Sequence, residues 1–146
     1  MLRRVVYISS SFAEDPRSEV AAFIGRARER NAARGVTGFL LFSDGAFLQV
    51  LEGPPDAVAE TLALVERDPR HSGLIVLLDT PARERLFDDW SMGWRELRPD
   101  EPLAASVRGV VEAGDVAFRR EGEGMLVETL MRSVLSAAGT SGLRAI

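Results

Sequence analysis

The chain has no cysteine and a single histidine, His71, among its 146 residues. Without cysteine it cannot form disulfides, thiolate metal sites or cysteine nucleophiles, and this composition is typical of a reducing compartment. One histidine excludes a metal centre built from several imidazoles, so we expect no metal. The N-terminal apolar run breaks into serines too early for a signal peptide, and no run is long enough to cross a bilayer. We therefore expect a cytoplasmic protein without a membrane partner.

A large excess of charge of one sign is also missing, because the net charge is only −4 and the pI is near 5.1. This mildly acidic balance argues against nucleic acid as the main partner. The chain lacks a GxGxxG fingerprint, a P-loop and a Gly-x-Ser-x-Gly elbow, which are motifs of nucleotide-binding and hydrolytic proteins. Its length can bury one core without disulfides or metals. We expect one structural unit that is not an enzyme.

The most informative stretch is Gly35–Gly53, in which two apolar runs flank Asp44-Gly45. Asp-Gly accepts the positive φ angles of a tight turn, so the stretch is predicted to be a β-hairpin. A two-residue turn fixes the register as Phe42 with Phe47, Leu40 with Gln49 and Gly38 with Leu51. Gln49 is then a carboxamide in an apolar row, and the diagonal Gly38 leaves room for it. An unmet buried amide costs roughly 1–3 kcal/mol, so a polar partner, a strand edge or a water must meet Gln49.

The other elements follow from the apolar periodicity. Strands are predicted over residues 3–9, 73–79 and 90–95, helices over 18–33 and from 55 to about 68, and one or two helical turns over 81–89. The first helix has an apolar stripe of Val20, Phe23, Ile24 and Ala27. Ser18 is its expected N-cap and Gly35 the residue after its end. Strand 73–79 is apolar throughout, so we expect it to be buried on both sides.

The order βαββαβ with a further strand predicts an α+β, ferredoxin-like fold with an added fifth strand. Right-handed crossovers place both helices on one face of a mixed sheet, with the first and third strands side by side at its centre. The opposite face carries Val6, Ile8, Leu48 and Val50. Helices predicted over 103–112 and 123–138 can cap this face or pair with a second subunit. Residues 1–97 are thus the expected domain, and 98–146 a helical cap or output segment of the same unit.

Residues that can carry chemistry are predicted to meet on the helix-facing side of the sheet. They are Tyr7 and Ser9 from the first strand, Gln49 from the third, Trp90 and Met92 from the last, and Asn31 at the end of the first helix. A phenol bonded to a carboxamide, beside a slot lined by Phe23 and Val65, suits a flat heteroaromatic ligand. The alternative is a core tyrosine satisfied by a core glutamine. Glu52 is expected to be a surface or capping charge, and Asp88-Asp89 a solvated loop.

The segments VVYISS, RNAARGVTGFLLF, GAFLQVLEGP, RDPRH and WSMGW occur in this order between residues 3 and 94. Over this range the chain resembles the BLUF domain, the sensor of blue light using FAD. The resemblance implies a ferredoxin-like fold with FAD, or another flavin such as FMN or riboflavin, bound non-covalently between the two helices. A flavin-free ferredoxin-like interaction or small-ligand module stays the alternative.

The resemblance also implies roles for single residues. Tyr7 would give an electron and a proton to the excited flavin, and Gln49 would then switch its hydrogen bonds by rotation or tautomerisation. The other residues implied near the flavin are Ser9, Phe23, Arg30, Asn31, Val65, Arg70 and His71, with Trp90 and Met92 coupling Gln49 to signalling. Arg30 stands where many relatives have Asn or His, and Val50 where some have Trp. Output would pass through the tail to a separate protein or through a homo-oligomer.

Overall fold

The computed structural model describes residues 1–10, 16–43, 45–69, 72–87, 92–101 and 104. In this part of the chain the elements are β1 (Leu2–Ser10), α1 (Pro16–Arg34), β2 (Thr37–Ser43), β3 (Ala46–Gly53), α2 (Pro55–Arg67), β4 (Ser72–Ala82) and β5 (Gly93–Glu96). The predicted tail helices lie outside the described residues, apart from Ala104. The predicted division at residue 97 into a domain and a cap also concerns this region.

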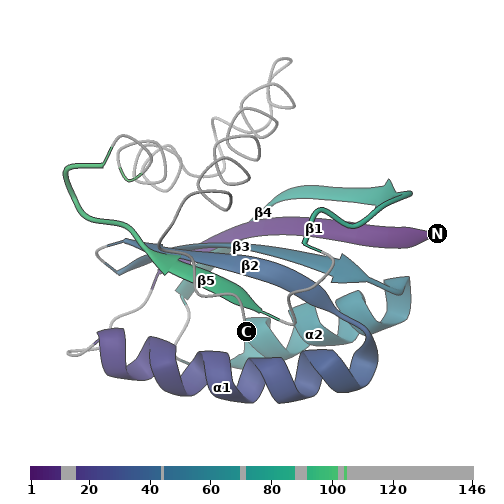
Figure 1. Ribbon diagram of the computed structural model, residues 1–146, viewed down its shortest axis with the longest axis horizontal. Coiled ribbons are helices and arrows are strands. Elements are labelled where there is room, and N and C mark those ends of the chain that lie inside the picture. Colours follow the sequence, from purple (N-terminus) through teal and green to yellow (C-terminus); the bar gives the residue numbers. More distant parts are fainter. Residues whose placement is uncertain (11–15, 44, 70–71, 88–91, 102–103, 105–146) are drawn as a thin grey trace.

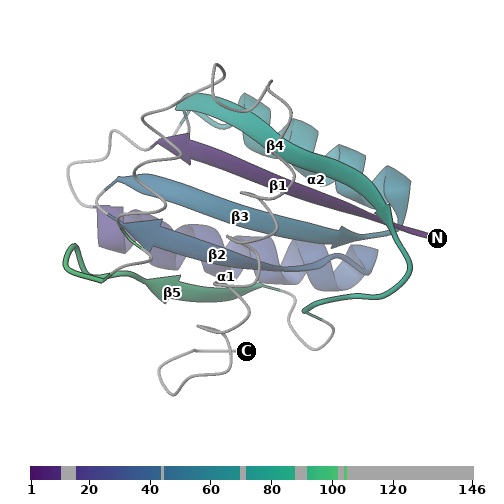
Figure 2. The ribbon, with the colours of Figure 1, turned by 90° about the horizontal axis from the view of Figure 1, so that it is seen from above.

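The sheet has the order β4-β1-β3-β2-β5. β1 is antiparallel to β3 and β4, β2 is antiparallel to β3, and β5 is parallel to β2. Both helices lie on the same face of this mixed sheet (Figures 1 and 2). The α+β, ferredoxin-like arrangement with an added fifth strand is confirmed, and so is the central position of β1 beside β3.

The β2–β3 hairpin has the predicted register, with Leu40 opposite Gln49 and Gly38 opposite Leu51. Gly45 takes a φ of 79°, as a tight turn requires. Gly38 has a different role from the predicted one. A Cβ atom at this position would lie 2.0 Å from the carbonyl oxygen of Val50, so the space is taken by the β3 backbone rather than by Gln49.

Each face of the sheet buries its own apolar cluster. The helix-facing cluster includes Val5 and Leu51 from the sheet and the predicted stripe of α1. The opposite cluster includes Val6, Ile8, Leu48 and Val50, as predicted, and Phe87, Leu97 and Ala104 pack on it. Alternation along each strand therefore sorts the side chains between two cores.

The first helix begins earlier than its periodicity predicts. α1 starts at Pro16, so Ser18 lies within the first turn and is not the N-cap. Proline suits this position because the N–H that it lacks would have no partner inside the helix. The other end agrees with the prediction, since α1 ends at Arg34 and Gly35 takes a φ of 69°.

β4 is an edge strand, and the prediction that it is buried on both sides is wrong. It pairs with β1 alone and runs on to Ala82. Ile75 and Leu77 are only half-buried, and Val76 is 39% exposed. An apolar run does not tell whether a strand lies at the centre of a sheet or at its edge.

β5 is shorter than predicted and begins at Gly93, with Met92 directly before it. Its ladder with β2 starts at the pair Phe39–Gly93, and the N–H of Leu97 extends it by donating to the carbonyl of Phe42 over 2.8 Å. Met92 lies on the helix-facing side, as predicted, and Trp94 packs against the same cluster. Trp90, which was expected to open this strand, lies outside the described residues.

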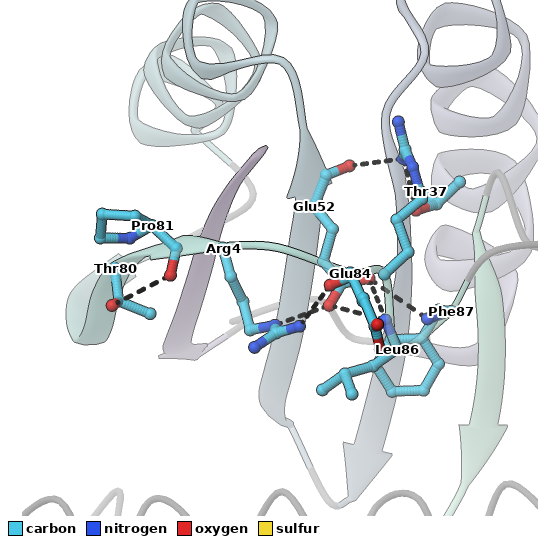
Figure 3. Close-up of polar contacts among 9 residues, drawn as sticks. Arg4, Thr37, Glu52, Thr80, Pro81, Glu84, Leu86 and Phe87 are labelled. Atoms are coloured by element: carbon cyan, nitrogen blue, oxygen red, sulfur yellow. Dashed lines mark hydrogen bonds and ion pairs between the residues drawn. The ribbon is translucent and has the colours of Figure 1, made fainter. Parts of the chain in front are cut away.

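The predicted helical turns over 81–89 are absent from the described part of that range. Residues 81 and 82 belong to β4, and residues 83–87, which we call the strap, follow it as bends. The strap is held by Glu52, whose Oε2 accepts hydrogen bonds from the N–H groups of Leu86 (2.9 Å) and Phe87 (3.2 Å) (Figure 3). The ring of Phe87 stacks on that of Phe39, with 5.4 Å between centroids.

Glu52 is therefore not the predicted surface or capping charge. Its side chain is fully buried, and Oε1 lies 2.6 Å from Nε of Arg4. Arg85 of the strap adds three hydrogen bonds, to the carbonyls of Gly35 and Glu52 and to the hydroxyl of Thr37. A buried carboxylate needs such partners, and the ones that Glu52 has come from β1 and from a segment more than 30 residues further along the chain.

Candidate functional site

Tyr7 and Gln49 lie directly opposite each other on β1 and β3. Both side chains are buried, and the Tyr7 hydroxyl donates a hydrogen bond to Oε1 of Gln49. The polar group that the sequence required for Gln49 is therefore Tyr7, brought into register by the pairing of two central strands.

The other end of the Gln49 amide faces sulfur. Nε2 of Gln49 donates a hydrogen bond to Sδ of Met92 over 3.3 Å, and Met92 is fully buried. A thioether can only accept, whereas a phenol can donate, so the amide nitrogen belongs on the Met92 side and the oxygen on the Tyr7 side. The three residues form one directed chain of hydrogen bonds.

Met92 is also held through its backbone. Arg28 of α1 donates a hydrogen bond from Nε to the carbonyl oxygen of Met92 over 3.2 Å. Burial lowers the pKa of Arg28 from its usual value. The sequence prediction missed this residue, although its spacing carries a signal: Arg28 lies four residues after Ile24, at the edge of the apolar stripe of α1.

A pocket lies between α1 and α2. Its lining residues are Phe23, Arg26, Ala27, Arg30, Leu64, Val65 and Asp68. Phe23, Arg30 and Val65, which the resemblance places against the flavin, are thus brought together. The pocket measures about 90 Å³, which is less than the roughly 300–1,000 Å³ usual for small-molecule sites. Leu64 and Arg26, on its outer wall, are exposed.

The charges of this pocket act on Tyr7. Burial raises the pKa of Tyr7 far above its usual value, the positive charge of Arg30 lowers it, and the negative charge of Asp68 raises it. Tyr7 is therefore a neutral phenol at ordinary pH. A neutral phenol is what the hydrogen bond to Gln49 Oε1 requires, because only the protonated form can donate.

Two further predicted residues lie close by in the fold. Ser9 is buried on the same face of β1 as Tyr7, two residues further on. Asn31 is buried near the end of α1, where its main-chain carbonyl accepts a hydrogen bond from the N–H of Val36. The side-chain oxygen of Asn31 accepts no hydrogen bond within the described part of the chain, although the residue makes other contacts. Neither Ser9 nor Asn31 is among the residues that line the pocket between α1 and α2.

The remaining predicted site residues, Arg70, His71 and Trp90, lie outside the described residues. Within the described ranges, no group of three or more His, Asp or Glu residues could hold a metal ion. No helix in those ranges is both long and apolar enough to cross a lipid bilayer.

A family model described as "Sensors of blue-light using FAD" matches residues 2–93. The chain belongs to the BLUF family. Its BLUF region is 35% identical over 92 residues to the photoactivated adenylate cyclase subunit beta of Euglena gracilis, covering 62% of this chain and 11% of that protein. It is 34% identical over 101 residues to the blue light- and temperature-regulated antirepressor BluF of Escherichia coli, covering 69% of this chain and 25% of that protein. The chain thus spans a quarter or less of these relatives.

A solved structure also matches the chain. The dark-state structure of the BLUF protein BlrB matches with a TM-score of 0.73 and 30% identity, over 93% of this chain and 96% of that one. The family model therefore shows membership of a family of flavin-based blue-light sensors, and the solved structure independently shows the fold of the BLUF domain.

Proposed function

We propose that this BLUF chain is a blue-light receptor that binds FAD between α1 and α2 and signals to another protein without catalysing a reaction itself. The observation that carries the proposal is the Gln49 amide, which accepts from Tyr7 at one end and donates to Met92 at the other. An amide bound at both ends has two alternative arrangements, and a change at one end must change the other.

The residues of the pocket fit a flavin ring. Phe23 and Val65 supply apolar walls, and Arg30 supplies a flat cation on the same side. The Asn31 amide is matched to the polar edge of the ring, and Ser9 supports the Tyr7 side. Arg70 and His71 complete the proposed set on the pyrimidine side. FAD is the proposed flavin, while FMN and riboflavin share the same ring.

When bound, the flavin absorbs blue light and in its excited state can take up one electron. Tyr7 would give the flavin that electron and, by way of Gln49, its phenolic proton. Both would return to Tyr7, so the cycle would involve no net oxidation. Gln49 is left with its amide turned or tautomerised, and its hydrogen bond to the sulfur of Met92 is lost. This is a population shift between two arrangements of one side chain.

Met92 carries the change out of the site. It directly precedes β5, the outer strand beside β2, and the chain then continues into residues 98–146. We propose that Met92, with Trp90, couples Gln49 to β5, and that the tail passes the signal to a partner protein or within a homo-oligomer. Residues 1–97 are then the sensor and 98–146 its output segment.

The first test is the absorbance spectrum of the purified protein, in the dark and after blue light. The expected result is a flavin spectrum that shifts to the red in light and returns in the dark. A colourless protein that cannot be reconstituted with FAD would end the proposal and favour a flavin-free interaction module. Chromatography of the flavin released by denaturation identifies FAD or FMN.

The assigned switch is tested by Gln49→Leu. This variant keeps the volume of the side chain and removes both ends of the amide, so it should bind flavin without any red shift. A normal red shift in Gln49→Leu would refute the role of Gln49. Steady oxidation of NAD(P)H by the wild type would instead indicate a flavin reductase.

A further inference from the structure

The place of Met92 beside Gln49 depends on a residue of the helix layer. Arg28 of α1 donates a hydrogen bond to the main-chain carbonyl of Met92, whose sulfur accepts from Gln49. We propose that Arg28 is a positioning residue of the light switch, which holds the Met92 backbone where its sulfur meets the amide. The inference rests on the proposed photoreceptor function and adds to it a link between α1 and the switch.

The backbone of Met92 lies outside the ladder that holds β5, so the hydrogen bond from Arg28 can fix its position. Met92 precedes the β2–β5 ladder, whose first pair is Phe39–Gly93. Methionine is unbranched and has three rotatable side-chain bonds, so the side chain alone does not fix the sulfur. With the carbonyl held by Arg28 and the side chain fully buried, the sulfur has few places to lie.

The guanidinium of Arg28 lies where an apolar side chain would be less costly. The side chain is half-buried, and its Nη2 is buried without a hydrogen bond in the part of the chain that the structure describes. Arginines at the edge of an apolar stripe usually keep the charged group in water. A charge-assisted hydrogen bond to a carbonyl offsets part of this desolvation. Packing of α1 on the sheet would not require a charge at this position, whereas the hydrogen bond to the Met92 carbonyl uses it.

The test uses the full chain with its flavin and measures the rate at which the red-shifted form returns in the dark. Arg28→Met keeps the length and the helix propensity of the side chain but removes the donor. We expect unchanged flavin content and slower recovery, because the sulfur is the acceptor to which the Gln49 amide returns. A hydrogen bond from a charged group changes an equilibrium constant by about a factor of ten, so the recovery rate should fall by roughly that much. A fall of less than about threefold, or faster recovery, overturns the proposal.

Two controls separate positioning from general effects on α1. Glu29→Gln removes a charge from the exposed neighbour of Arg28 and should recover at the wild-type rate. Slowing in Glu29→Gln equal to that in Arg28→Met would mean that any change of charge on α1 suffices, and would overturn the proposal. Should Arg28→Met fail to hold flavin, Arg28→Gln, which is shorter and uncharged, is judged by the same threshold.

A double-mutant cycle tests whether Arg28 acts through Met92. Met92→Leu keeps the volume and removes the sulfur, so there is no acceptor left to position. In this background Arg28→Met should cause no further slowing. If it slows recovery there as much as in the wild type, Arg28 acts by another route and the proposal fails.

The outcomes distinguish this inference from the function on which it rests. A wild type without flavin or without a red shift refutes the photoreceptor proposal itself. A wild type that shifts, an inactive Gln49→Leu and an Arg28→Met variant that recovers normally refute only the role of Arg28.

Discussion

Glu52 and Arg4 form an ion pair in which a fully buried carboxylate oxygen lies 2.6 Å from Nε of a mostly buried guanidinium. The same carboxylate accepts hydrogen bonds from the N–H groups of Leu86 and Phe87. Gln49 and Glu52 are three residues apart on β3, so they lie on opposite faces of the sheet. The face that carries the Tyr7–Gln49 pair and the face that holds the strap thus share one strand.

Glu52→Gln should destabilise the fold. The variant leaves the Arg4 guanidinium without its charged partner and can turn an amide N–H₂ group towards the two strap N–H groups. Breaking a buried ion pair by removing one partner costs about 3–5 kcal/mol, and we expect about 3 because Arg4 is partly exposed. Urea denaturation followed by circular dichroism measures this change in the free energy of unfolding.

The matched control is Asp79→Asn, which breaks the Arg3–Asp79 pair at the exposed edge of the sheet. Its N–O distance is 2.7 Å, close to that of the buried pair, but the Asp79 side chain is 46% exposed. Exposed pairs contribute about 0–1 kcal/mol, so the control should lose little stability. Equal losses in the two variants would contradict the importance of burial for the Glu52 pair.

Tyr7 is the only tyrosine of the chain, which makes its titration directly visible. Burial raises the pKa of Tyr7 in the folded state, while the unfolded value stays at about 10. Its contribution to stability is therefore fully present below pH about 10 and is lost as the pH rises towards the folded pKa. In flavin-free protein, tyrosinate absorbance should appear only together with the loss of circular dichroism. Tyrosinate that forms near pH 10 in folded protein would contradict the burial of the phenol.

Tyr7→Phe should separate flavin binding from photochemistry. The substitution keeps the ring in the core but removes the donor to Gln49 Oε1, which leaves a buried acceptor unmet at a cost of roughly 1–3 kcal/mol. We expect bound flavin and no light-induced red shift, measured by absorbance before and after blue light. A wild-type shift in Tyr7→Phe would show that another residue is the donor.

Gly38→Ala and Gly25→Ala should change stability in opposite directions. A Cβ at Gly38 would lie 2.0 Å from the Val50 carbonyl oxygen, so β2 and β3 must separate, whereas nothing lies within 4 Å of one at Gly25. In an exposed helix position Ala is better than Gly by roughly 0.5–1 kcal/mol. Thermal unfolding should therefore show a lower midpoint for Gly38→Ala and a slightly higher one for Gly25→Ala. A Gly38→Ala variant as stable as the wild type would contradict the close approach of the strands.

Local signals predicted most of the fold. The Asp-Gly turn fixed the β2–β3 register, and alternation along β1 and β3 placed Tyr7 and Gln49 on one face. Once the element order indicated a ferredoxin-like sheet, the contact between these two residues followed from topology. The pair therefore needed no information beyond strand periodicity and strand order.

Periodicity could not predict contacts between residues that are distant in sequence. Glu52 at a strand end looks like a surface charge, because the strap that buries it comes more than 30 residues later. Arg28 looks like one of several helix-surface arginines until Met92 is placed beside it. β4 looked central because its sequence is apolar, although it pairs on one side only.

β5 is the one parallel strand of the described sheet, is four residues long and lies at the edge. Removing it would leave a complete antiparallel unit of four strands whose own ladders are untouched. Displacing β5 therefore breaks only the backbone hydrogen bonds between β5 and β2. The ladders between the other four strands stay intact. The sheet thus consists of a four-stranded antiparallel unit and a short edge strand, and Met92, which accepts the hydrogen bond of the Gln49 amide, lies where the two meet.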